Sequence, residues 1–190
     1  TGALFRCVKT AAHLRMVVKS WHWVFQSGKL IHQEFARTQT AMIRVHGTSV
    51  AFLLGDQWFA VLLRGSSGSG KSDLALRLIE SGARLVADDQ TELQLQDGGI
   101  MASVPERLAG RIEVRGVGIV EIEHLASARL VLVCDLCASE DVPRMPEEEC
   151  VQLLDHKVGL LRVAPFEFSA PIKVRLGVEA ARRGILGRNF

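Results

Sequence analysis

From residue 43 onward, short apolar runs alternate with polar turns, and this pattern is typical of β-strands. The runs predict strands at 43–46, 50–54, 58–63, 84–87, 91–96, 100–104, 112–115, 117–122, 129–136, 150–154 and 158–163. Turn residues between two runs, as in Asp97-Gly98-Gly99, predict hairpins. Helical periodicity occurs at 71–81 and 171–183, and one short helical turn fits 105–109.

The predicted strands outnumber the predicted helices, and several strands follow one another without a helix between them. A doubly wound parallel sheet would instead alternate strand and helix along the chain. The largely apolar run at 129–136 suits a strand that is buried in the middle of a sheet. We therefore expect an α/β domain built on a strand-rich mixed sheet.

Residues 1–41 differ from the rest in composition, because they hold six of the 23 Lys and Arg residues and only one of the 21 Asp and Glu residues. Such a basic, aromatic stretch suits a membrane-surface helix, a targeting segment or a partner-binding arm. The simplest expectation is a helical or disordered extension without a catalytic part. We expect the catalytic domain to cover 42–190, with Met42 as its natural start directly before the first strand.

The composition narrows the classes of function. A chain of 190 residues that is 48% hydrophobic and 23% charged suits one packed domain with an extension. We find no run of membrane-spanning length and no secretory signal, so we expect a cytoplasmic protein. Four cysteines are too few for a disulfide framework, and the acidic balance after residue 41 argues against nucleic-acid binding.

The segment between the strand at 58–63 and the helix at 71–81 matches the pattern G-x-x-x-x-G-K-[ST]. It consists of Gly65, Ser66, Ser67, Gly68, Ser69, Gly70, Lys71 and Ser72. The glycines let the backbone turn its N–H groups around a phosphate chain, which also meets the positive N-terminus of the helix. We expect Lys71 to reach the β- and γ-phosphates and the Ser72 hydroxyl to bind Mg²⁺. The sequence therefore predicts a P-loop that binds a nucleoside triphosphate.

A P-loop alone does not identify a reaction, which depends on the acids near the phosphates. Asp88 and Asp89 follow the strand at 84–87, and one acid of such a pair can hold Mg²⁺ while the other accepts a proton from an attacking hydroxyl. Asp135 is a rival, because it lies near the end of the apolar strand at 129–136, as in Walker-B segments. The pattern leaves both options open. Cys134 and Cys137 form a single C-x-x-C pair, for which core packing is a better interpretation than a metal site.

Three motifs in this order, at 65–72, 84–89 and 112–120, resemble the catalytic domain of the bacterial HPr kinase/phosphorylase family. The third contains Glu113-Val114-Arg115-Gly116-Val117-Gly118-Ile119, which matches a family signature that ordinary P-loop ATPases lack. His46-Gly47 matches the family's His-Gly pair. The segment 165–176 resembles the ending of the family's short branch, which lacks an N-terminal domain, and the resemblance covers most of residues 42–176.

The resemblance implies a phosphoenolpyruvate-carboxykinase-like P-loop fold and a protein-serine kinase. Such an enzyme transfers the γ-phosphoryl group of ATP to a serine of the phosphocarrier HPr, in the regulation of carbon metabolism through the phosphotransferase system. By the same resemblance, Asp89 is the general base, with Asp88 and His46 beside it. The family's phosphorolysis of phosphorylated HPr and its hexameric assembly are further expectations.

The resemblance also implies roles for residues around the phosphates. Ser72 and Glu113 hold Mg²⁺, Lys71 binds phosphate, and Arg115 supports the signature loop. Two other functions remain open: a nucleotide-binding regulatory module without phosphoryl transfer, and a generic P-loop hydrolase that uses Asp135.

Overall fold

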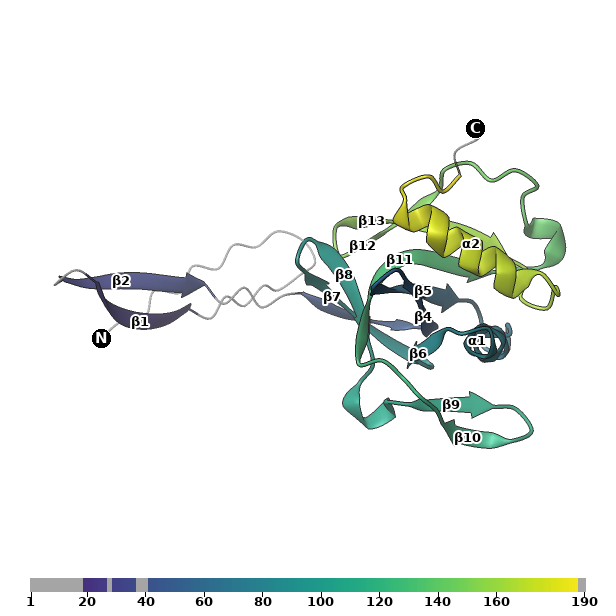
Figure 1. Cartoon of the computed structure of the whole chain (residues 1–190), viewed down its shortest axis with the longest axis horizontal. Coiled ribbons are helices and arrows are strands. Elements are labelled where there is room, and N and C mark those ends of the chain that lie inside the picture. Colours follow the sequence, from purple (N-terminus) through teal and green to yellow (C-terminus); the bar gives the residue numbers. More distant parts are fainter. Residues whose placement is uncertain (1–18, 27–28, 37–40, 188–190) are drawn as a thin grey trace. The chain divides into compact units, whose positions relative to one another are not determined.

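The computed structural model describes residues 19–26, 29–36 and 41–187. The chain divides into two compact units, Thr1–Gln39 and Thr40–Phe190. In the first, β1 (Lys19–Gln26) and β2 (Lys29–Ala36) pair as an antiparallel hairpin (Figure 1).

The expectation of a helix or disorder over 1–41 is therefore wrong for these two strands, while residues 1–18 lie outside the described part of the chain. The physical reason is local, because Trp21, Trp23 and Phe25 recur at every second position and aromatic residues favour strands. The start of the catalytic domain at Met42 stays a prediction.

The second unit is built on one nine-stranded mixed sheet (Figure 1). Its strands are β3 (Met42–His46), β4 (Thr48–Leu54), β5 (Gln57–Arg64), β6 (Arg84–Ala87), β7 (Gln90–Gln96), β8 (Gly99–Ser103), β11 (Ser127–Leu136), β12 (Cys150–Leu153) and β13 (His156–Val163). The main path runs β3-β7-β8-β11-β5-β4-β6, and β13 pairs with both β11 and β12. β11 is parallel to β5 and β13, and the other pairings are antiparallel. The mixed sheet predicted from the sequence is confirmed.

Two helices, α1 (Lys71–Glu80) and α2 (Ala170–Arg182), pack on the same face of the sheet. Leu74, Ala75 and Leu78 form the buried stripe of α1, at the spacing that the helical period requires. α1 ends at Glu80, and Gly82 follows in the left-handed region with φ of 99°. The opposite face of the sheet has its own apolar cluster, because successive strand residues point to alternate sides.

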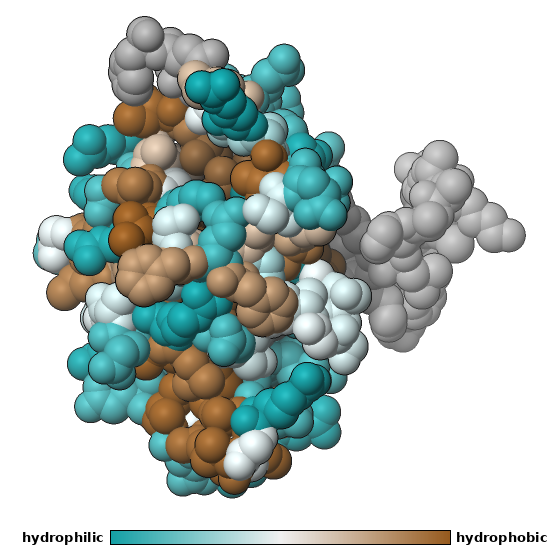
Figure 2. Space-filling model, turned by 90° about the vertical axis from the view of Figure 1, so that its right-hand side faces the viewer, coloured by the Kyte–Doolittle hydropathy of each residue, from teal (hydrophilic) through white to brown (hydrophobic). Residues whose placement is uncertain are grey.

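A small hairpin lies outside the main sheet. Its strands are β9 (Arg111–Val114) and β10 (Gly118–Glu121), which pair antiparallel. The short 3-10 helix η1 (Glu106–Leu108) precedes β9. Ile112 is buried in the cluster beneath α1 and fixes the hairpin to the domain. Val117 in the turn and Ile119 on β10 are exposed, and Figure 2 shows hydrophobic surface at the bottom of the view, over this hairpin.

The parallel trio β5, β11 and β13 determines where the loops gather. Strands that run in the same direction end at the same edge of a sheet, and ligands of α/β proteins bind outside that edge. The loop 65–70 follows β5, the turn η2 (Ser139–Asp141) follows β11, and the loop 164–169 follows β13. In the described part of the chain, neither helix is long and apolar enough to cross a membrane.

Leu78→Ala should lower the free energy of unfolding by about 2–5 kcal/mol, because the removed side chain is fully buried and leaves a cavity. Urea unfolding followed by circular dichroism measures this loss. Leu176→Ala makes the same change at an α2 position that is 58% exposed, and should alter stability by less than about 0.5 kcal/mol. Equal losses in the two variants would contradict the core described here.

Candidate active site

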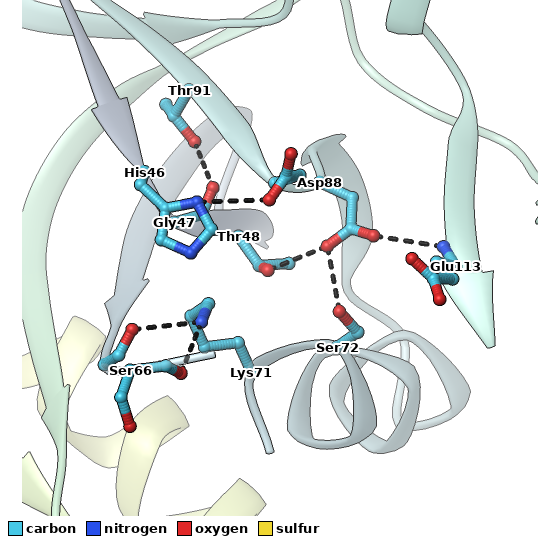
Figure 3. A network of polar contacts seen from close by, with 11 residues as sticks. His46, Gly47, Thr48, Ser66, Lys71, Ser72, Asp88, Thr91 and Glu113 are labelled. Atoms are coloured by element: carbon cyan, nitrogen blue, oxygen red, sulfur yellow. Dashed lines mark hydrogen bonds and ion pairs between the residues drawn. The ribbon is translucent and has the colours of Figure 1, made fainter. Parts of the chain in front are cut away.

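The P-loop connects the end of β5 to the start of α1, as the sequence predicts (Figure 3). Gly68 and Gly70 have φ of 78° and 90°, a backbone conformation that favours glycine. The Lys71 side chain folds over the loop, where its Nζ donates to the backbone oxygens of Gly65 at 3.0 Å and Ser66 at 2.9 Å. The lysine cation is therefore held at the mouth of the loop, where phosphate oxygens would compete with these carbonyls.

Asp88 lies behind the P-loop and is only 9% exposed. Its Oδ1 accepts hydrogen bonds from the hydroxyls of Thr48 at 2.8 Å and Ser72 at 3.0 Å, and its Oδ2 accepts from the backbone N–H of Glu113 at 3.1 Å (Figure 3). Both carboxylate oxygens are thus bound to donors from other elements. This arrangement suits a residue that positions its neighbours rather than one that takes up a proton.

Asp89, the next residue, has a different environment. Its backbone is in the left-handed region with φ of 64°, which aspartate tolerates better than most residues. Its side chain is 67% exposed, and its Oδ1 lies 3.1 Å from Nδ1 of His46. The backbone oxygen of Asp89 accepts a hydrogen bond from the N–H of Gly47 at 3.0 Å. This bond holds the turn between β6 and β7 in place. Asp89 is therefore the acid of the pair that is free to meet a substrate.

A buried chain of hydroxyls supports this part of the site. The Thr91 hydroxyl donates to the backbone oxygen of Gly47 at 3.0 Å and lies 2.8 Å from the Ser49 hydroxyl. Gly47 itself leaves no room for a side chain, because a Cβ there would come within 2.7 Å of the Leu63 backbone oxygen. The backbone between His46 and Thr48 is therefore held in place by the hydrogen bond from Thr91 and by its close packing against Leu63.

Lys71, the two aspartates and His46 line one cleft of about 630 Å³. The predicted site residues that line it are His46, Ser67, Gly68, Gly70, Lys71, Ser72, Asp88, Asp89, Glu113 and Arg115. Three P-loop residues do not line it: Gly65 and Ser66 bind Lys71 through their carbonyls, and the Ser69 hydroxyl is buried without a partner among the described residues. The structure thus brings together acids that are far apart in the sequence.

The oxygen donors in the cleft fit a magnesium ion. The Ser72 hydroxyl, bound to Asp88, and the exposed carboxylate of Glu113 are hard oxygen ligands on adjacent elements. Among the described residues no group of three or more His, Cys, Asp and Glu side chains forms a metal site. Mg²⁺ in nucleotide enzymes needs no such cage, because it takes one or two protein ligands and completes its shell with waters and substrate phosphates.

Comparison with known proteins identifies the family. A model of the HPr serine kinase C-terminal domain matches residues 37–135. The chain belongs to this family. The match covers the P-loop, the aspartate pair and the β9–β10 hairpin that together form the cleft of this kinase-family domain.

Curated relatives of the domain are named HPr kinase/phosphorylase. The protein from Clostridium kluyveri is 32% identical over 126 residues, which are 63% of this chain and 40% of the relative. The protein from Brevibacillus brevis is 49% identical over 72 residues, or 37% of this chain and 23% of the relative. The chain thus spans less than half the length of these relatives.

A solved structure has a similar fold. It is the Hpr(Ser) kinase/phosphatase from Coxiella burnetii, with a TM-score of 0.63 and 23% sequence identity. The superposition covers 75% of this chain and 92% of that structure. This likeness supports the strand-rich P-loop fold of the family member described here.

Asp135, the rival metal ligand, lies outside the cleft of this family member. Its two carboxylate oxygens accept from Nε and Nη2 of Arg64 at 2.8 and 2.9 Å, a paired contact across the parallel strands β5 and β11. Neither Asp135 nor Arg64 lines the cleft, so Asp88 and Glu113, which do, are the acids beside the P-loop.

The C-x-x-C pair offers no reactive thiol. Burial, with a smaller effect of the Asp135 charge, raises the pKa of Cys134 far above its ordinary value. Burial and the nearby Asp141 also raise the pKa of Cys137. Thiols that stay protonated are poor nucleophiles and poor metal ligands, so core packing is the better interpretation of this pair.

Sequence reasoning missed two residues of the site. Thr48 was missed because it lies between the predicted strands 43–46 and 50–54, and a threonine there gives no sign of a buried acceptor 40 positions away. Phe166 lines the cleft from the loop after β13, although the sequence shows only an apolar residue in a turn.

Thr48→Val should lower the free energy of unfolding by about 1–3 kcal/mol, because it removes a hydroxyl donor and leaves a buried lone pair of Asp88 unsatisfied. Thr48→Ser keeps the hydroxyl and removes one methyl group, which should cost about 1 kcal/mol or less. Urea unfolding of both variants makes the comparison. A serine variant as unstable as the valine variant would show that the hydrogen bond to Asp88 is not what matters.

Proposed function

We propose that this chain is an ATP-dependent protein kinase that phosphorylates a serine of HPr, the protein after which its relatives are named. The single observation that carries the proposal is the different environment of two adjacent acids beside the P-loop. Asp88 is buried and bound to three donors, whereas Asp89 is exposed and turned into the same cleft. This arrangement provides one residue to organise the site and one to accept a proton.

The proposed reaction needs positioning more than covalent chemistry. The P-loop N–H groups and Lys71 hold the phosphates of ATP. Asp89 takes the proton of the serine hydroxyl while the serine oxygen bonds to the γ-phosphorus, and the bond from that phosphorus to the β,γ-bridging oxygen breaks to release ADP. His46, 3.1 Å from Asp89, orients the carboxylate.

Other groups in the cleft neutralise charge. Ser72 and Glu113 would hold Mg²⁺, which supplies positive charge next to the phosphate oxygens. Arg115 lines the cleft from the turn after β9 and adds to the positive charge of Lys71. A cytoplasmic location belongs to the proposal because ATP is its substrate, and the phosphorolytic reaction and hexameric assembly stay predictions.

The two other functions fit the geometry less well. A hydrolase that relies on Asp135 would need an acid that is instead paired with Arg64. A regulatory module that only binds nucleotide would not need an exposed acid in the cleft, where Asp89 lies beside His46. Label transferred from γ-labelled ATP to a serine of purified HPr distinguishes the kinase from both alternatives.

Asp89→Asn should reduce phosphoryl transfer to HPr by about 10²–10⁴-fold while ATP binding is largely retained, because the variant removes the proton acceptor and no phosphate contact. Asparagine also tolerates the positive φ of this position, so the backbone is preserved. Transfer is measured with γ-labelled ATP, and binding by calorimetry. Transfer at the unmutated rate would show that Asp89 is not the base.

Glu113→Gln should raise the Mg²⁺ concentration for half-maximal transfer by at least about tenfold, an effect that loss of even a secondary metal contact can produce. The backbone N–H of residue 113 still binds Asp88 in this variant. Glu123→Gln is the matched control, because Glu123 lies just after β10, its side chain binds Arg84, and neither residue lines the cleft. An unchanged Mg²⁺ requirement in Glu113→Gln would exclude Glu113 as a ligand.

A further inference from the structure

Phe166 is an exposed aromatic residue in an unusual place. Its side chain lines the cleft although the residue is 73% exposed. The edge of its ring lies against the last turn of the P-loop, because a Cβ on Gly70 would be 2.9 Å from the ring carbon Cζ. Phe168, two residues further, is 96% exposed and does not line the cleft. A phenyl ring left open to water beside a phosphate-binding loop suggests a ligand that covers it.

The backbone around Phe166 is held firmly. Arg77 of α1 donates to the backbone oxygens of Pro165 and Glu167, which flank the phenylalanine. The Glu167 side chain in turn binds Lys173 and accepts from the Ser139 hydroxyl at 2.7 Å. The ring is therefore presented by a fixed loop, and ordering it for a ligand would cost little conformational entropy.

The sheet order shows which end of a nucleotide lies near Phe166. Asp88 follows β6 and accepts from Thr48 on β4, and Asp89 is the next residue, so both acids lie on the β4–β6 side of the P-loop strand β5. Phe166 follows β13, on the opposite side of β5 beyond β11. If the γ-phosphate points toward Asp89, the other end of the nucleotide leaves the P-loop toward Phe166.

We infer that Phe166 stacks on the base of the bound nucleotide. The inference rests on the proposed nucleotide binding and adds the subsite for the base. Every nucleobase offers a π-face, and stacking on an aromatic side chain contributes to binding without a hydrogen-bond code. In the part of the chain that the structure describes, Phe166 is the one residue with a phenyl or indole ring that lines the cleft.

The test separates the base from the phosphates by comparing two ligands on the full chain. Phe166→Ala should weaken binding of Mg-ATP by about tenfold, the loss expected for one base–aromatic stack. Binding of Mg-tripolyphosphate, which has the phosphates but no base, should change by less than about twofold. Phe166→Trp should retain the affinity for ATP, and Phe168→Ala is the matched control that should bind both ligands normally. Calorimetry gives all the dissociation constants.

The outcomes distinguish this inference from the function on which it rests. Equal losses for both ligands in Phe166→Ala would mean that the ring supports the P-loop, and no loss for either would mean that it contacts nothing; both results overturn the inference. Failure of the unmutated chain to bind either ligand would instead overturn the proposed nucleotide-binding function.

Discussion

The buried carboxylate of Asp88 is the interaction on which the rest of the site depends. It accepts hydrogen bonds from β4, from the first turn of α1 and from the backbone of β9, so three separate elements are joined at one side chain. A buried anion is tolerated only when its lone pairs are satisfied, and hydrogen bonds to a charged acceptor are stronger than those between neutral groups. The P-loop helix, the sheet and the β9–β10 hairpin are therefore held at fixed positions around the cleft.

This constraint also explains why two neighbouring acids differ. Since Asp88 is turned inward to its donors, the chain must reverse at once, and Asp89 takes the left-handed conformation at φ of 64°. The N–H of Gly47 then binds the backbone oxygen of Asp89, and the next residue, Gln90, donates its N–H to the Asp88 backbone oxygen at 2.7 Å. Burying one carboxylate thus exposes the other beside His46, and a single turn yields one fixed acid and one free acid.

The sequence predicted what local patterns determine. The P-loop, the strands of the mixed sheet and both helices depend on residues that are near one another in the chain, and the structure contains them. The different environments of Asp88 and Asp89 were not predictable, because they depend on Thr48 and Glu113, 40 and 25 positions away. The sequence could not exclude Asp135 as the metal-binding acid for the same reason. Its partner Arg64 is 71 positions away, and the two residues become neighbours only through the pairing of β5 with β11.

The mixed sheet itself explains why the beginning of a strand belongs to the site. In a wholly parallel sheet, only the carboxyl ends of the strands meet at the ligand-binding edge. Here β4 lies between β5 and β6 and runs antiparallel to both, with Thr48 opposite Leu63 and Ser49 opposite Ala87. The amino end of β4 therefore lies at the edge where β5 and β6 end. His46 and Thr48 meet Asp88 and Asp89 because of this reversal, and a sheet in which β4 ran parallel would place them at the opposite edge.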